Sequence, residues 1–166
     1  LPSRRNEFDD DQRWPLDVQV AGELAPLQQH LQAQGWKVQP QAGWEQALMM
    51  LDLKASPSEV AVMPATLDTR VESLLMLRPG TRDGEIYALR LWQGPTMLQP
   101  GSTPLWLGSA QTLQFERYLH LVGLWRPIRG ADPALNAVRD ALTPLETRTE
   151  TDPDTAMPVL LVRTTP

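Results

Sequence analysis

The chain has 166 residues, of which 42% are hydrophobic, and a formal net charge of −5. This length fits one domain with a single core, and the acidic balance argues against a general binder of nucleic acid, which needs concentrated Lys and Arg. The absence of cysteine excludes disulfides, thiolate metal sites and a cysteine nucleophile, and no stretch is apolar enough to span a bilayer.

The first fifteen residues are polar and acidic and end at Trp14-Pro15. We expect residues 1–15 to form an arm or linker in front of a single domain over residues 16–166. The chain begins with Leu1 and has no initiator Met, so we expect it to be a soluble piece of a longer protein.

The first half of the domain alternates between strand and helix signals. Strict alternation predicts a strand over 16–20, and leucines at helical spacing before Gly35 predict a helix over 23–34. A short strand over 36–39 follows, and an apolar stripe predicts a second helix over 44–53. The strand over 16–20, the helix over 23–34 and the strand over 36–39 form a unit that could contribute one parallel strand pair.

The second half is richer in strand signals. We expect strands over 60–63 and 71–77, although 74–77 could instead be helical. An antiparallel meander is predicted over 85–92, 104–113 and 115–125.

The C-terminal part contains one more helix. Asp132-Pro133 is typical of a helix N-terminus, and the apolar face that follows predicts a helix over 132–142. Residues 143–158 are expected to form a loose connection to a last strand over 159–163. The predicted fold class is α+β: a mainly antiparallel, mixed sheet with about three helices packed on one face.

Candidate reactive side chains are few. The two histidines, His30 and His120, are 90 residues apart and share no motif, so we expect no metal site and no cofactor. His120 falls in the predicted last meander strand, where Glu116 could orient it. Gly108-Ser109 lacks the Gly-x-Ser-x-Gly pattern of a serine hydrolase, and we assign no catalytic residue.

The six tryptophans are the strongest functional feature, because Trp combines a large apolar face with one N–H donor. Trp92 and Trp106 could pair across the predicted hairpin. Arg90 shares a face with Trp92, where it could stack on a ring or bind a phosphate or carboxylate, or could simply stabilise the sheet. We therefore take Arg90, Trp92, Trp106 and His120 as the candidate face for a ligand or partner.

A set of short runs in a fixed order resembles the LssY C-terminal domain family across roughly the whole chain. The runs are Leu1-Pro2 with Arg4-Arg5, the segment 16–22, Gly35-Trp36, Val62-Met63-Pro64, Leu89-Arg90-Leu91-Trp92 and Pro104-Leu105-Trp106-Leu107-Gly108-Ser109. Domains of this family occur in bacterial envelope proteins, often after DedA-like or PAP2-type phosphatase membrane segments, and sometimes in predicted lipoproteins.

The resemblance implies a membrane-anchored parent protein whose own membrane domain is the first expected partner. It implies a soluble domain tethered to the bacterial inner membrane, with the periplasmic side favoured over the cytoplasmic side. It does not imply a phosphatase, because the Lys, Arg and His motifs of PAP2 chemistry are absent. Where some relatives carry Thr-His before an Asp-Pro helix start, this chain has residues 126–131 without a histidine.

Two functional hypotheses remain open, beside a third possibility that the domain is a structural spacer or stability element of its parent protein. The first is a non-catalytic accessory or binding domain that contacts a partner domain, a lipid headgroup, another envelope protein or an exported substrate, with no nucleic acid. The alternative is a hydrolase of unrecognised type that acts on a phosphate or ester through His120 and a nearby carboxylate.

Overall fold

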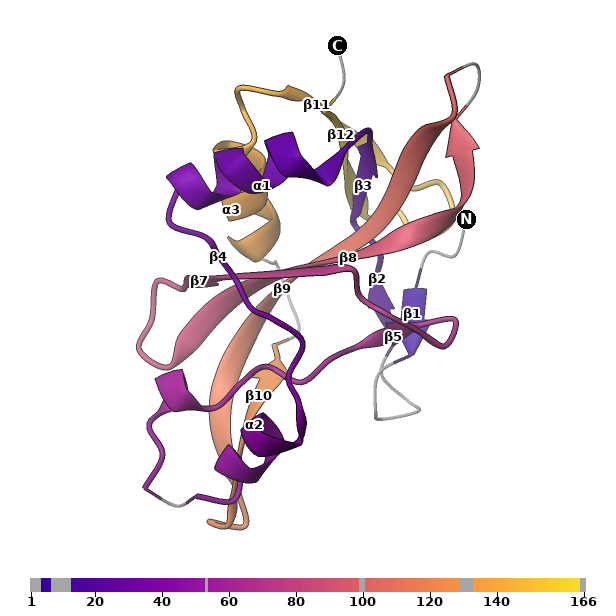
Figure 1. Cartoon of the computed structure of the whole chain (residues 1–166). Coiled ribbons are helices and arrows are strands. Elements are labelled where there is room, and N and C mark those ends of the chain that lie inside the picture. The colour runs from indigo at the N-terminus through magenta and orange to yellow at the C-terminus, as the bar shows by residue number, and fades with distance from the viewer. Residues whose placement is uncertain (1–3, 7–12, 53, 99–100, 129–132, 165–166) are drawn as a thin grey trace.

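The computed structural model describes residues 4–6, 13–52, 54–98, 101–128 and 133–164. Its main feature is a sheet of eight strands, with two of the helices, 24–33 and 133–141, packed on one side (Figure 1). The strands of this sheet are β3 (Val18–Ala21), β4 (Lys37–Val38), β7 (Leu74–Pro79), β8 (Glu85–Leu98), β9 (Thr103–Tyr118), β10 (Val122–Pro127), β11 (Glu146–Thr151) and β12 (Pro158–Arg163). The helices are α1 (Leu24–Ala33), α2 (Trp44–Met49), α3 (Pro133–Ala141) and a short 3₁₀ helix, η1 (Pro57–Glu59).

The strands follow the order β11-β12-β3-β9-β8-β7-β4, and β10 also pairs with β9. All pairs are antiparallel except β3 with β12, where Val18 lies opposite Leu160. Two further two-stranded pairs lie outside the sheet: β1 (Arg4–Asn6) with β2 (Arg13–Pro15), and β5 (Thr66–Leu67) with β6 (Arg70–Val71).

Strand β9 has two partners along one edge. Its residues 105–108 pair with β3, whereas residues 113–118 pair with β10. Between them the Asp17 carboxylate accepts the Ala110 N–H at 2.8 Å, and the Ile128 N–H donates to the Thr112 carbonyl at 2.9 Å. These two bonds satisfy backbone groups of β9 that would otherwise lie unpaired between its β3-paired and β10-paired segments.

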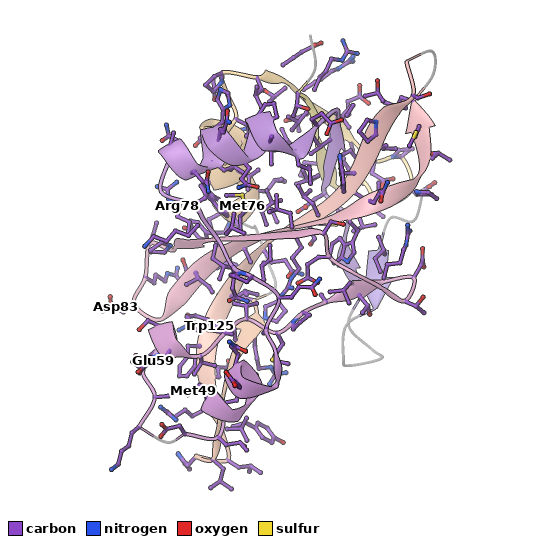
Figure 2. All side chains as sticks on the ribbon, in the orientation of Figure 1. Met49, Glu59, Met76, Arg78, Asp83 and Trp125 are labelled. Carbon is purple, nitrogen blue, oxygen red and sulfur yellow. The ribbon has the colours of Figure 1, made fainter. Side chains whose placement is uncertain are left out.

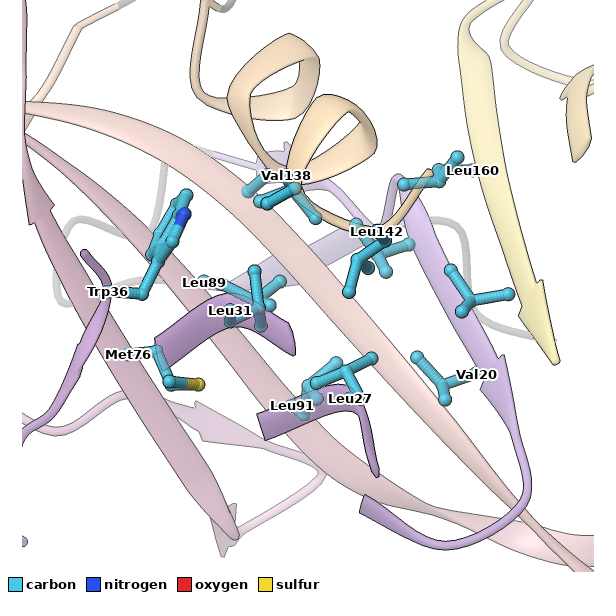
Figure 3. Packing of buried hydrophobic residues seen from close by; sticks show 14 of the residues in the cluster. Val20, Leu27, Leu31, Trp36, Met76, Leu89, Leu91, Val138, Leu142 and Leu160 are labelled. Carbon is cyan, nitrogen blue, oxygen red and sulfur yellow. The ribbon is translucent and has the colours of Figure 1, made fainter. Parts of the chain in front are cut away.

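The main core lies between the sheet and helices α1 and α3 (Figure 3). Leu27 and Leu31 of α1 and Val138 of α3 pack on Leu89 and Leu91 of β8, and all five are essentially inaccessible to solvent. Gly108 is placed where β9 runs between β3 and β8. A Cβ there would lie 2.5 Å from a Leu91 methyl and 2.9 Å from the Arg90 carbonyl, so no side chain fits.

The opposite face of the sheet carries two smaller apolar clusters. One contains Trp92 and Leu107 with Leu16 and Leu67, and the other contains Ala88 and Leu113 with Val62 and Leu75. The segment 60–72, which we call the strap, supplies Val62 and Leu67 to these clusters. The strap therefore covers the sheet face that the two main helices leave open.

The predicted fold class is confirmed, with a correction to the helices. Within the described residues two helices, α1 and α3, cover one face rather than about three. Helix α2 has only six residues, and the segment after it bonds to β10 through the Met50 carbonyl and the Gly123 N–H. Met49 and Trp125 mark this lower part of the molecule in Figure 2.

Several strand predictions were wrong in position. Residues 60–63 form no strand. The strand predicted over 71–77 is confirmed for 74–77, which lie in β7, so the helical alternative for these residues is wrong. The predicted loose connection over 143–158 contains β11, which is stabilised by full pairing with β12. The early strand–helix–strand unit gives no parallel pair, because β4 pairs antiparallel with β7.

The segment predicted as an arm is only partly described. Residues 4–6 and 13–15 form the β1–β2 pair, and the rest of 1–15 lies outside the described residues. The predicted helix start at Asp132 also lies outside them, whereas the helix itself is present as α3.

Candidate functional site

Arg90 is buried on the sheet face that the strap covers. Its guanidinium lies 2.7 Å from the Glu72 carboxylate, and the two side chains are 5% and 3% exposed. Arg90 also donates to the Met63 carbonyl at 3.0 Å, while the second Glu72 oxygen accepts the Ala65 N–H at 2.7 Å. Arg90 thus holds both ends of the segment 63–72 on the sheet.

Trp92 is also buried between the sheet and the strap. It shares a face with Arg90, as predicted, but its ring is 1% exposed and its Nε1–H donates to the Ala65 carbonyl at 3.3 Å. Its aromatic surface packs against Leu16, Leu67 and Leu107.

Trp106 lies on the other face of the sheet. Trp92 is opposite Leu107, and Trp106 is opposite Gln93, so the two rings project to different sides and the predicted pairing across the hairpin is wrong. Trp106 packs against the main core, and its Nε1–H donates to the Gly22 carbonyl at 2.9 Å.

His120 lies in a turn and not in a strand. Strand β9 runs on to Tyr118, which pairs with Val122, and the Leu121 N–H donates to the Tyr118 carbonyl at 3.0 Å. Leu119 and His120 occupy the two central turn positions with φ of 51° and 57°. We call residues 118–121 the β9–β10 tip. The four candidate residues therefore do not form one surface: Arg90 and Trp92 lie under the strap, Trp106 lies on the helix side, and His120 lies at the tip.

The largest exposed apolar side chains near the tip form a group at one end of the molecule. Tyr118 is 58% exposed, Leu119 72%, Leu121 59%, and Leu51 60%. Residues 50–52 and 54–55 are held along the base of the hairpin, since Met50 bonds to Gly123 and the Arg117 guanidinium donates to the Ala55 carbonyl at 2.6 Å. We call Leu51, Tyr118, Leu119 and Leu121 the apolar end.

Two buried polar side chains beside Arg90 make no hydrogen bond within the described part of the chain. Ser109 lies opposite Arg90, and Gln111 lies opposite Ala88 on the same face. Neither the Ser109 hydroxyl nor the two Gln111 amide atoms has a partner, and Gln111 is only 2% exposed. Ser109 is therefore a buried sheet residue whose hydroxyl is hydrogen-bonded to no base in the described structure. Ser109 and Gln111 lie on the same face as the two smaller apolar clusters.

A small cavity lies beside the strap. Its volume is about 130 Å³, and its walls include Val38, Val62, Pro64, Glu72 and Leu75. This is smaller than the roughly 300–1,000 Å³ of typical small-molecule sites. The Glu72 carboxylate in its wall is already bonded to Arg90 and to the Ala65 N–H.

Three further titratable groups, His30, Glu59 and Asp152, form hydrogen bonds with residues close to them in the sequence. His30 lies inside α1, and its Nδ1 is 2.8 Å from the carbonyl of Pro26, four residues earlier in the same helix. Hydrogen bonds from the Ser56 hydroxyl and backbone N–H lower the pKa of Glu59, and the backbone N–H of Asp154 is the main cause of the lowered pKa of Asp152. Within the described residues, no three His, Asp or Glu side chains converge as metal ligands would.

The family model described as LssY C-terminus matches residues 1–153. The chain belongs to this family. No curated protein and no solved structure matches the chain. In this LssY C-terminal domain, the described residues contain no helix with the length and apolar character needed to cross a membrane.

Sequence reasoning missed the apolar end because the tip carries no turn-forming residue. The run Tyr118-Leu119-His120-Leu121 has neither Gly nor Asn nor Pro, so it resembled a strand interior. One signal was available. In a strand, Leu119 and Leu121 would lie on one face and Tyr118 on the other, so a strand that buries only one face would still leave apolar side chains exposed.

Proposed function

We propose that this LssY C-terminal domain is a non-catalytic binding module of a bacterial envelope protein, and that it contacts its partner through the apolar end. The observation that carries the proposal is the exposure of Leu51, Tyr118, Leu119 and Leu121 together at one end of the fold. A group of large exposed apolar side chains is typical of an interaction site. The envelope location and the tether to the inner membrane come from the resemblance of the sequence to envelope domains.

The proposal changes the role of three candidate residues. Arg90, Trp92 and Trp106 each donate to a backbone carbonyl inside the domain, so they stabilise the scaffold that carries the contact surface. His120 stays part of the contact surface because it lies in the tip.

The alternative, hydrolysis through His120 and a carboxylate, has weaker support. Glu116, the carboxylate expected beside His120, has an oxygen 3.7 Å from the Arg126 guanidinium. General base catalysis needs a carboxylate within hydrogen-bond reach of the imidazole or of the substrate. Turnover of p-nitrophenyl phosphate or p-nitrophenyl acetate that is lost in His120→Ala, with an unchanged melting temperature, would favour the alternative.

Site-specific photocrosslinking in cells tests the binding proposal. The photoreactive residue p-benzoylphenylalanine is placed at position 119 of the native full-length protein, and at position 82 as a control. Arg82 is also exposed, in the turn between β7 and β8. We expect a defined crosslinked species, to protein or to lipid, from position 119 only. Equal crosslinking at both positions, or none at position 119, would contradict the proposal.

A further inference from the structure

The backbone of the β9–β10 tip is in a conformation that its residues disfavour. Leu119 and His120 both have positive φ, at 51° and 57°, in a turn closed by the bond from the Leu121 N–H to the Tyr118 carbonyl. Hairpin turns with two left-handed residues strongly favour Asn-Gly, because the Cβ of other residues approaches the following carbonyl. A leucine here strains the turn.

The side chain that causes the strain makes little contact with the rest of the domain. Leu119 is 72% exposed, and its neighbours Tyr118 and Leu121 are 58% and 59% exposed. The tip therefore combines a strained backbone with hydrated apolar surface, and neither stabilises the fold. Strain of this kind is a reason to look for a role outside folding.

The shape of the tip restricts what it contacts. The connection is narrow, with only residues 119–121 between the paired Tyr118 and Val122, and Leu119 is the most exposed apolar side chain of this turn. The apolar end lies at the far end of the β9–β10 hairpin, away from α1 and α3 (Figure 1). A narrow apolar turn with a tyrosine just before it fits the interface of a lipid bilayer, where tyrosine rings and leucines are both stable.

The charges around the base of the tip support the same occupant. In the two segments that bond to each other beside the tip, within residues 50–55 and 115–126, the cations are Lys54, Arg117 and Arg126, and the carboxylates are Asp52 and Glu116; Glu45 of the neighbouring α2 lies outside these segments. Three cations against two carboxylates give +1 with His120 neutral, although the whole chain carries −5.

The position of these charges also fits a bilayer surface. Residues 117–121 contain no acid, and the Arg117 guanidinium is bonded to the Ala55 carbonyl behind the apex. Cations behind an inserted apolar group lie at the level of lipid phosphates.

We infer that the β9–β10 tip inserts Leu119 and Leu121 into the interfacial region of a lipid bilayer, with Arg117 and Lys54 at the level of the lipid phosphates. This inference rests on the proposed function and names lipid as the partner of the same surface. Insertion buries the apolar side chains that the fold leaves hydrated.

The test uses vesicles of phosphatidylcholine, with and without phosphatidylglycerol. Because the chain has no cysteine, a single cysteine at position 119 or at the control position 82 can carry an environment-sensitive fluorophore. We expect the emission from position 119 to shift to the blue on addition of vesicles, and the emission from position 82 to stay unchanged.

The unlabelled double variant Leu119→Asn, His120→Gly separates insertion from folding. It gives the turn its preferred residues, so we expect an equal or higher melting temperature, while partitioning into vesicles falls about tenfold because a leucine side chain no longer enters the bilayer. The matched control is Leu98→Asn, which changes an exposed leucine at the other end of β8 and should leave partitioning unchanged.

The outcomes distinguish the inference from the proposed function. Equal partitioning of the double variant and the parent chain, or no partitioning of the parent chain into either vesicle, overturns lipid insertion. A crosslink from position 119 to a protein, without vesicle partitioning, keeps the binding module and rejects lipid as its partner.

Discussion

Arg90 is the residue whose environment differs most from what its sequence suggested. The run Leu89-Arg90-Leu91-Trp92 places a cation beside an aromatic ring, which is compatible with a ligand site. In the fold the guanidinium instead contacts Glu72 and the Met63 carbonyl, both from the strap. The sequence predicted the shared face of Arg90 and Trp92 correctly, but it contains no local signal that Glu72, 18 residues earlier, covers that face.

We predict that Arg90→Met destabilises the domain by about 3–5 kcal/mol, because the Glu72 carboxylate is left buried without its cation. Adding Glu72→Gln to Arg90→Met should restore part of this loss, since the amide is neutral and its oxygen still accepts the Ala65 N–H. Urea unfolding of the single and double variants measures both effects.

The exposed ion pair of Arg126 and Glu116 provides the matched control for the Arg90 and Glu72 variants. Both of its side chains are about half exposed, so Arg126→Met should change the free energy of unfolding by less than about 1 kcal/mol. An Arg90→Met variant no less stable than Arg126→Met would mean that the buried pair does not hold the strap on the sheet.

Gln111 is a buried amide whose side-chain atoms have no hydrogen-bond partner in the described structure. Such a group costs about 1–3 kcal/mol relative to a satisfied or apolar one. We therefore predict that Gln111→Met, which keeps a similar length, raises the free energy of unfolding by about 1 kcal/mol or more. Gln93→Met, at an exposed position of β8, should change it by less than about 0.5 kcal/mol. A loss of stability in Gln111→Met would show that the amide has a stabilising contact.

At the scale of elements, local signals predicted the helices of the main core well. Helix α1 ends as expected, with Gly35 at φ 84°, and α3 begins at Pro133, the proline predicted for its first turn. Both helices carry an apolar face that the sheet buries, so local pattern and tertiary packing agree. Helix α2 is shorter than its apolar stripe suggested, because the segment from Met50 onward is bonded to the β9–β10 hairpin.

Strand boundaries were predicted less well because pairing decides them. Strand β9 continues through Phe115 to Tyr118, and its turn falls on Leu119 and His120, which carry no turn signal. Strand β11 has an exposed, polar sequence that predicted a loop, yet all six of its residues pair with β12. A polar edge strand is stabilised by its ladder and not by its own apolar pattern.

At the scale of the whole molecule, the last strand, β12, connects the C-terminal part of the chain to the N-terminal part by pairing with both β11 and β3. Strand β12 lies between β11 and β3, and its parallel pairing with β3 places Leu160 and Val162 in the main core. The family match ends at residue 153, before this strand begins. The fold therefore depends on residues beyond the matched segment.

We predict that a chain ending at Pro153 does not fold, although it contains the whole matched segment. This truncation removes three buried apolar side chains, Val159, Leu160 and Val162, each contributing about 1.5–3 kcal/mol, and leaves β3 and β11 without their shared partner. The combined loss is comparable with the roughly 5–15 kcal/mol that stabilises a typical domain. Thermal unfolding followed by circular dichroism should show no cooperative transition for the chain of residues 1–153.

A chain ending at Thr164 is the control for this truncation, because it keeps β12 and the bond from the Thr164 N–H to the Ala21 carbonyl at 2.9 Å. It should melt within a few degrees of the full chain. A peptide of residues 154–166 added to the shortened chain should restore part of the transition, since β12 pairs through its backbone with two strands that the shortened chain still contains. A chain of residues 1–153 that melts cooperatively at the temperature of the full chain would mean that β12 is an addition to a core that is already complete without it.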